Sequence, residues 1–205
     1  MLFSSITFLY YFLPCVLAAY FIAPKRWRNA VLLGFSLFFY GWGEPRYLIF
    51  MIAAILQGYL FGRLMERYRD HARAFLAASL IFSLGLLGVC KYADFFLENL
   101  GRLTGHSLPL LKIALPIGIS FYTFQILSYV IDVYRGEVPA QKSLIALGAY
   151  ISMFPQLIAG PIVRYSDIRK ELKDRQHTLE GAASGAVRFV CGLSKKVLFA
   201  NTLGE

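Results

Sequence analysis

The sequence has 205 residues, of which 58% are hydrophobic and only 16% are charged. Because about a quarter of the residues of a soluble domain are charged, this composition excludes an ordinary soluble domain and indicates a protein covered by membrane lipids. The net charge of +9 could mark a nucleic-acid-binding surface. The basic residues instead lie in short clusters between apolar runs, as in membrane proteins, so we expect no nucleic-acid partner.

Apolar runs of helical length follow one another along the whole chain. A helix needs about 20 mostly apolar residues to cross a bilayer. The first run, 2–23, is longer than the apolar region of a signal peptide and lacks preceding basic residues, so we expect a retained helix. The sequence therefore predicts an all-α, polytopic transmembrane helical bundle of six to seven segments. The later segments are 30–42, which is short, 47–62, 74–97, 113–134, 144–163 and a weaker 182–200.

The charges of the connecting loops predict the orientation. Cytoplasmic loops carry an excess of Lys and Arg. With the N-terminus outside, the inner loops hold nine basic residues and the outer loops hold three. We therefore expect a multi-pass protein of the inner (plasma) membrane with an external N-terminus. The nine residues are Lys25, Arg26, Arg28, Arg63, Arg67, Arg69, Arg73, Arg135 and Lys142, and the three are Arg46, Arg102 and Lys112.

The run 144–163 does not fit a simple crossing. A full crossing would leave the basic segment 164–177 outside, against the charge bias. Pro155 and the step Gly160-Pro161 interrupt the run, and proline removes a backbone donor and disfavours helix just before it. We therefore expect a re-entrant or kinked segment, followed by a surface helix within 164–177 on the inner side.

Polar residues within the run 113–134 are the first candidates for function. Gln125, Ser128 and Asp132 share one helix face at spacings of three and seven residues. Polar groups in hydrocarbon are costly, so these side chains face partners or water. One interpretation is structural hydrogen bonding between helices, and the other is the wall of a polar tunnel. We expect Asp132 to lie at the inner interface and to pair with Arg135.

The second candidate stretch is 153–165, where broken backbone occurs together with Gln156 and Arg164. Arg164 could extend from a helix end to lipid headgroups. Alternatively, its fork of donors could line the path of an anionic ligand. The three histidines lie outside the apolar runs, no metal-ligand spacing is present, and no common catalytic motif appears. The residues by themselves therefore predict a polytopic membrane protein with a polar, broken centre.

These stretches resemble the hallmark segments of the membrane-bound O-acyltransferase family. They read LPIGISFYTFQILSYVIDVYRG (115–136) and FPQLIAGPIVRY (154–165). The similarity is greatest to the bacterial branch that acylates alginate and teichoic acids. Three further segments resemble this branch in the same order: MLFSSITFLYYFLPCVLAAYF (1–21), FFYGWGEPRYL (38–48) and GLSKKVLFAN (192–201).

The resemblance implies a transferase with an acyl-thioester donor, acyl-CoA or an acyl-carrier protein, on the inner side and no bound cofactor. It also implies a polysaccharide acceptor outside the membrane, and extracytoplasmic polysaccharide-modification proteins as partners. Members are about twice as long, and their second half holds the catalytic histidine in a Trp-His-Gly motif. This sequence has no Trp-His pair, so it resembles an N-terminal half that is inactive alone. A transporter or export subunit, or a non-catalytic scaffold, remains the alternative.

Overall fold

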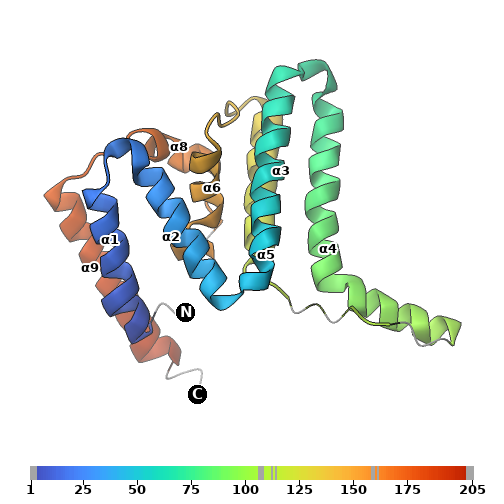
Figure 1. The fold of residues 1–205 in the computed structure, drawn as a ribbon, viewed down its shortest axis with the longest axis horizontal. Coiled ribbons are helices and arrows are strands. Elements are labelled where there is room, and N and C mark those ends of the chain that lie inside the picture. Colours follow the sequence, from blue (N-terminus) through green and yellow to red (C-terminus); the bar gives the residue numbers. More distant parts are fainter. Residues whose placement is uncertain are drawn as a thin grey trace.

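The computed structural model describes residues 4–105, 109–111, 113, 115–157, 160 and 162–201, and this part consists of helices and loops without a strand. The bundle is built from helices that run alternately up and down (Figure 1). Short 3-10 turns join three of the hairpins. The helices are α1 (Leu13–Ile22), which continues a π-helical turn (Thr7–Phe12), α2 (Arg28–Gly43), α3 (Leu48–Arg67), α4 (Ala72–Thr104), α5 (Ile119–Arg135), α6 (Leu144–Ser152), α7 (Phe154–Leu157), α8 (Tyr165–Lys173) and α9 (Leu179–Lys195), which ends in a second π-helical turn (Lys196–Asn201).

Two helical segments are long and apolar enough to cross a membrane. They are Pro45–Arg67, which contains α3, and Arg69–Thr104, which contains α4. The apolar helix Thr7–Ile22 is shorter. The all-helical fold class is therefore confirmed for the described residues, and α3 and α4 form the antiparallel hairpin that stands upright in Figure 1.

Helix α5 begins later than the sequence predicted. The run 113–134 was expected to be helical throughout, but α5 starts at Ile119. Gly118 precedes it with φ +76°, a left-handed conformation that favours glycine. A Cβ at Gly118 would also lie 2.8 Å from the carbonyl oxygen of Leu157, at the end of α7. The start of α5 is therefore fixed by a close approach of two backbones, which hydrophobicity does not reveal.

Small residues allow α3 to pack closely on α5. A Cβ added to Gly58 would lie 3.1 Å from Cγ2 of Ile126, and one added to Gly62 would lie 2.8 Å from Oη of Tyr129. Both partners are fully buried on α5. The spacing of these two glycines thus marks a packing surface, as small residues do in membrane helices. The pair Gly181 and Gly185 has the same spacing, but no described residue packs against Gly185.

A buried polar clamp joins α3 to α4. Gln57 donates from Nε2 to Oγ of Ser83 over 2.9 Å, and its Oε1 accepts from Oγ of Ser79 over 3.0 Å. All three side chains are buried. The clamp satisfies both ends of the amide, so burial of Gln57 leaves neither polar atom unpaired.

Replacing Gly62 by alanine should destabilise the bundle, whereas the same change at Gly85 should not. At Gly62 the new Cβ meets the fully buried ring of Tyr129, and such overpacking costs about 1–3 kcal/mol. At Gly85, on α4, no described atom lies within 4 Å of an added Cβ, so only the gain in helix propensity of up to about 1 kcal/mol remains. Melting temperatures in detergent should fall for Gly62→Ala and stay equal or rise for Gly85→Ala. Equal effects at both positions would contradict the packing of α3 on α5.

Candidate functional site

Two polar side chains on one face of α5 bind the broken segment 144–165, which follows α5 in the chain. Gln125 donates from Nε2 to the carbonyl oxygen of Tyr150 in α6 over 3.1 Å. Two turns later, Asp132 accepts from Nη2 of Arg164 over 2.6 Å. Gln125 and Asp132 therefore bind opposite ends of the segment 150–164. The polar face predicted from the sequence is directed at this segment.

The partner of Asp132 differs from the predicted one. Asp132 was expected to pair with Arg135, but its carboxylate contacts Arg164, and Arg135 contacts Glu137 at 3.7 Å. The physical reason is burial, because the carboxylate of Asp132 lies inside the bundle while Arg135 extends into solvent and pairs with Glu137. The side chain of Asp132 is 2% exposed, that of Arg164 is 50% exposed, and that of Arg135 is 62% exposed. Among the described residues, only Arg164 brings a cation onto the buried carboxylate.

The end of α5 places a second carboxylate beside Arg164. Gly136 adopts φ +77°, and the N–H of Glu137 then donates to the carbonyl oxygen of Asp132 over 3.0 Å, which is a Schellman ending. Glu137 accepts from Nη2 of Arg164 over 3.3 Å. Arg164 is thus shared between two carboxylates, one buried and one exposed. The hydrogen bond to Asp132 and its charge raise the pKa of the Arg164 guanidinium, so this group stays cationic.

The chain enters and leaves the broken segment at the same end of the bundle. Gln141, which precedes α6, donates from Nε2 to Oη of Tyr165 at the start of α8 over 2.9 Å. Its backbone N–H donates to Oη of Tyr129 over 2.9 Å. Tyr150 donates from Oη to the carbonyl oxygen of Val163 over 2.8 Å. These bonds hold the return of the chain next to its point of entry.

The break in the helix begins at Met153, just after α6, where the backbone leaves the helical region with ψ 109°. Pro155 lies two residues later in the single turn of α7, and its ring nitrogen has no proton to donate to the turn of α6 before it. The predicted interruption at Pro155 is therefore found. Gly160 is described, but Ala159 and Pro161 lie outside the described residues.

The remaining two predicted site residues are not joined to the others by described hydrogen bonds. Ser128 is half-buried on α5 and has no described partner for its hydroxyl. Gln156 is half-buried in α7, and its Oε1 is buried without a described hydrogen-bond partner. Of the five candidates, the structure links Gln125, Asp132 and Arg164 through the segment 144–165, while Ser128 and Gln156 are unlinked.

Tyrosines complete the site, and the sequence analysis did not select them. Tyr129, Tyr150 and Tyr165 are all fully buried, and the ring of Tyr165 packs edge-on against the other two at 5.0 and 5.5 Å. Burial raises the pKa of the Tyr165 phenol, so it remains a neutral hydroxyl that can accept a hydrogen bond from Gln141. The helical spacing could have revealed Tyr129, which lies four residues after Gln125 on the same face of α5.

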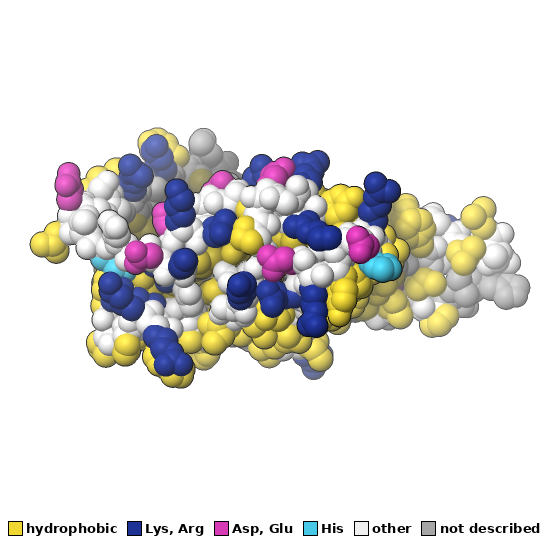
Figure 2. Space-filling view, turned by 90° about the horizontal axis from the view of Figure 1, so that it is seen from above, with side chains coloured by type: hydrophobic (Ala, Val, Ile, Leu, Met, Phe, Trp, Pro, Cys, Tyr) yellow, Lys and Arg dark blue, Asp and Glu magenta, His cyan; other side chains and the backbone are white. Residues whose placement is uncertain are grey.

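One end of the bundle is strongly basic, and we call it the basic end. Hydrogen bonds join the segments that form it. The side-chain amide of Asn29 donates to the carbonyl oxygen of Leu172, and the backbone N–H of Ala140 donates to the carboxylate of Glu66. Figure 2 looks down on this end and shows many Lys and Arg side chains among few acidic ones. It carries Lys25, Arg26 and Arg28, the basic residues of Arg63–Arg73 at the junction of α3 and α4, Arg135 at the end of α5, Lys142 in the loop after it, and Arg164, Arg169, Lys170, Lys173 and Arg175 in and beside α8.

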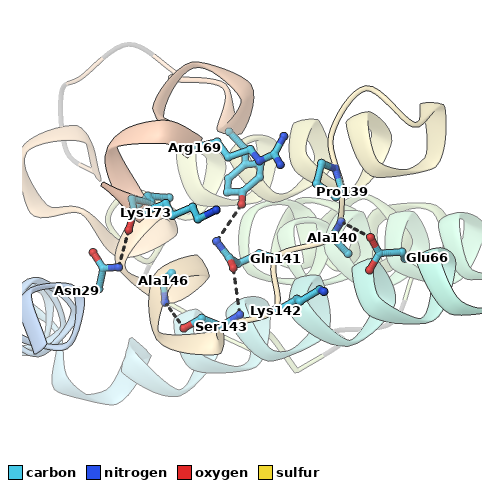
Figure 3. Close-up of a pocket in the computed structure, with 12 residues that line it drawn as sticks. Asn29, Glu66, Pro139, Ala140, Gln141, Lys142, Ser143, Ala146, Arg169 and Lys173 are labelled. Carbon is cyan, nitrogen blue, oxygen red and sulfur yellow. Dashed lines mark hydrogen bonds between the residues drawn. The ribbon is translucent and has the colours of Figure 1, made fainter. Parts of the chain in front are cut away.

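A pocket of about 510 Å³ opens at the basic end (Figure 3). It lies between the start of α2, the end of α3, the loop before α6, and α8. Three cations line it, opposed by the single carboxylate of Glu66. The volume suits a small ligand, and the charges favour an anionic one. The cations are Lys142, Arg169 and Lys173.

No group of three or more metal-ligating side chains lies together among the described residues. His71 is exposed in the turn before α4, and His177 is exposed and shares a hydrogen bond of 3.0 Å with Oη of Tyr20. His106 lies outside the described residues. The arrangement can therefore bind and orient a ligand through Arg164, amides and phenols, and the described part brings no histidine into the polar centre.

Comparison with known proteins gives relatives along the whole chain. The chain is 40% identical over 210 residues to a probable alginate O-acetylase of Pseudomonas syringae and to one of Pseudomonas aeruginosa. It is 30% identical over 235 residues to a peptidoglycan O-acetyltransferase of Helicobacter pylori. The alignments cover 98–99% of this chain. The resemblance to the membrane-bound O-acyltransferases is confirmed.

The chain spans about 40% of the length of the alginate O-acetylase relatives and 45% of that of the peptidoglycan O-acetyltransferase. No family model matches the sequence, and no solved structure matches it. The similarity to the O-acetyltransferases therefore extends over this whole chain but over less than half of each relative.

Replacing Arg164 by glutamine should destabilise the helical bundle more than Arg135→Gln does. Arg164→Gln leaves the buried carboxylate of Asp132 without a cation. The free energy of unfolding should fall, though less than for a fully buried pair, because Arg164 is half-exposed while the carboxylate left behind is buried. Arg135→Gln removes only an exposed pair and should cost under about 1 kcal/mol.

The second variant for this prediction is Asp132→Asn in the Arg164→Gln background. It removes the unpaired charge and should recover most of the loss in the free energy of unfolding, measured in mixed micelles. If Arg164→Gln and Arg135→Gln have equal effects, the ion pair does not hold the segment 144–165.

Proposed function

We propose that this chain is part of a membrane-bound O-acyltransferase that transfers an acyl or acetyl group to hydroxyls of an extracytoplasmic polysaccharide. The observation that carries the proposal is the 40% identity, over 99% of the chain, to proteins named probable alginate O-acetylase. The similarity to a peptidoglycan O-acetyltransferase supports the same class of reaction. A transporter would be expected to contain paired broken segments in repeated halves, and the comparisons give it no support.

In the proposed membrane arrangement the N-terminus is outside and the basic end faces the cytoplasm. Six to seven segments lie in the membrane, and α6–α7 is a re-entrant pair. The excess of positive charge at one end supports this orientation. The length of α6 supports the re-entrant path, because nine residues rise only about 14 Å and cannot cross a hydrocarbon core of about 30 Å.

The acyl donor in this proposal is a thioester, either acyl-CoA or an acyl-carrier protein, that approaches from the basic end. The pocket with Lys142, Arg169 and Lys173 offers cations to the donor's phosphates. Gln125, Ser128, Asp132, Gln156 and Arg164 form one wall of the path along which the acyl group meets its acceptor. The unpaired Oε1 of Gln156 supports a polar ligand on this path, because a buried acceptor without a donor is costly.

The catalytic base in this proposal is a histidine that this chain does not supply. The sequence contains no Trp-His pair, which the resemblance associates with that histidine. A histidine in the path would deprotonate the acceptor hydroxyl as a general base. This chain would then position the donor, work together with extracytoplasmic polysaccharide-modification proteins, and show no transfer by itself.

A chimera tests the proposal directly. Residues 1–205 replace the matching segment of the Pseudomonas aeruginosa relative, and acetylation of alginate is measured in cells that lack the native protein. The chimera should acetylate alginate, while the 205-residue chain alone should not. Arg164→Ala in the chimera should reduce acetyl transfer per folded molecule by about a hundredfold, the loss expected when groups are misplaced by about 1 Å.

The matched control in the chimera is Arg135→Gln, which should leave acetyl transfer per folded molecule unchanged. Melting temperatures are measured on the same preparations, so that lost activity and lost stability are separated. If Arg164→Ala lowers the melting temperature but not the activity per folded molecule, Arg164 only joins helices. If the folded, unaltered chimera transfers no acetyl group, the proposed function is wrong.

A further inference from the structure

A small basic hollow lies beside the start of α2, next to the pocket of the proposed donor cations, with which it shares Lys173. It has a volume of about 190 Å³ and lies between the residues that precede and begin α2 and the end of α8. Five cations line it against two carboxylates, so its net charge is positive. The cations are Lys25, Arg26, Arg28, Lys173 and Arg175, and the carboxylates are Glu171 and Asp174.

Arg28 is half-buried in this hollow. Its guanidinium lies over the ring of Tyr20 at 5.2 Å, and that of Arg175 lies over the same ring at 5.8 Å. Nε of Arg28 is buried and has no described acceptor. Both guanidinium groups also line the hollow, so their like charges repel each other across it, and an anion in the hollow would relieve the repulsion. The hollow therefore fits a negatively charged group.

An apolar groove begins one helical turn further along the same helix. It has a volume of about 360 Å³ and is lined by Val31, Gly34, Phe35 and Phe38. Gly34 keeps the groove open, since no described atom lies within 4 Å of a Cβ placed there. From Arg28, Val31 and Phe38 follow at three and ten residues, so they lie on the same face of α2.

The hollow and the groove together span a length of α2 that matches one leaflet of a bilayer. The ten residues from Arg28 to Phe38 rise about 15 Å, half of a hydrocarbon core of about 30 Å. Trp27 lies just before α2 and is exposed, and tryptophan is enriched at the level of the headgroups. The hollow thus lies at headgroup level, and the groove extends into the hydrocarbon.

We infer that this part of the molecule binds one anionic phospholipid. The phosphate occupies the hollow between Arg28 and Arg175, and an acyl chain lies in the groove along α2. Neither feature alone specifies a lipid, because a free phosphate would need only the hollow and a neutral lipid only the groove. The combination of a half-buried cation with an apolar groove on one helix face, the two together spanning the depth of a leaflet, specifies both parts of the ligand. Arg28, Arg175 and the groove, which carry this inference, do not line the pocket of the proposed acyl donor.

Native mass spectrometry of the 205-residue chain in detergent tests this site. Phosphatidylglycerol and phosphatidylcholine of equal chain length are added together, and the lipid retained by the chain is identified. Phosphatidylglycerol should be preferred. Arg28→Gln and Arg175→Gln should each weaken its binding about fivefold, the effect of one basic residue near an anionic lipid. Gly34→Leu should weaken binding of both lipids by filling the groove.

The first matched control is Arg102→Gln, which removes an exposed cation at the end of α4 farthest from the basic end. The second is Gly85→Leu, which changes an exposed glycine with open space beside it. Both should bind phosphatidylglycerol as the unaltered chain does, and melting temperatures check that each variant is folded. Competition with glycerol 3-phosphate should not displace the lipid. Displacement by glycerol 3-phosphate without an effect of Gly34→Leu would mean a free-phosphate site, and equal retention of the two lipids would mean an uncharged groove. Either result, or equal effects of site and control variants, overturns the inference.

Discussion

The buried carboxylate of Asp132 is the constraint on which the arrangement of the broken segment depends. A carboxylate that is 2% exposed requires a cation nearby, and among the described residues only Arg164 supplies one. Its Nη2 binds Oδ1 of Asp132, while Oδ2 has no described hydrogen-bond partner. Arg164 lies 32 residues further along the chain, so this pairing brings the chain back to the end of α5. Tyr150 and Gln141 add hydrogen bonds that stabilise the same return. The folded-back path of 144–165 follows from this one electrostatic requirement together with the proline that ends α6.

Hydrophobicity predicted the positions of most helices because the apolar runs are separated by clear interruptions. The break at Gly43-Glu44-Pro45 separates α2 from α3, and the basic residues Arg67 and Arg69 flank the turn before α4. The start of α5 was predicted too early, because the left-handed conformation of Gly118 depends on the approach of Leu157, about 40 residues away. Contacts of that kind are tertiary, and a pattern along the chain does not contain them.

The candidate site was predicted only in part, again because a pattern along the chain does not contain tertiary contacts. Helical spacing correctly placed Gln125 and Asp132 on one face, because that face is a property of a single helix. The partner of Asp132 was predicted wrongly, since the nearest cation in the sequence, Arg135, points to solvent while a distant one reaches the carboxylate. The buried tyrosines were missed because aromatic residues are common throughout this apolar sequence. Only the fold distinguishes a buried tyrosine such as Tyr165 from an exposed one such as Tyr10.

The central claim is that the chain enters and leaves the segment 144–165 on one side of the membrane, the cytoplasmic side. Single cysteines at Arg69, Lys173 and Leu103, in a background with Cys15 and Cys191 changed to serine, can be probed in spheroplasts with an impermeant maleimide. The account predicts that the cysteines at 69 and 173 react only after the membrane is permeabilised, while the cysteine at 103, at the opposite end of α4, reacts in intact spheroplasts. Reaction of the cysteine at 173 but not of that at 69 in intact spheroplasts would mean that the segment crosses the membrane fully, and would contradict the account.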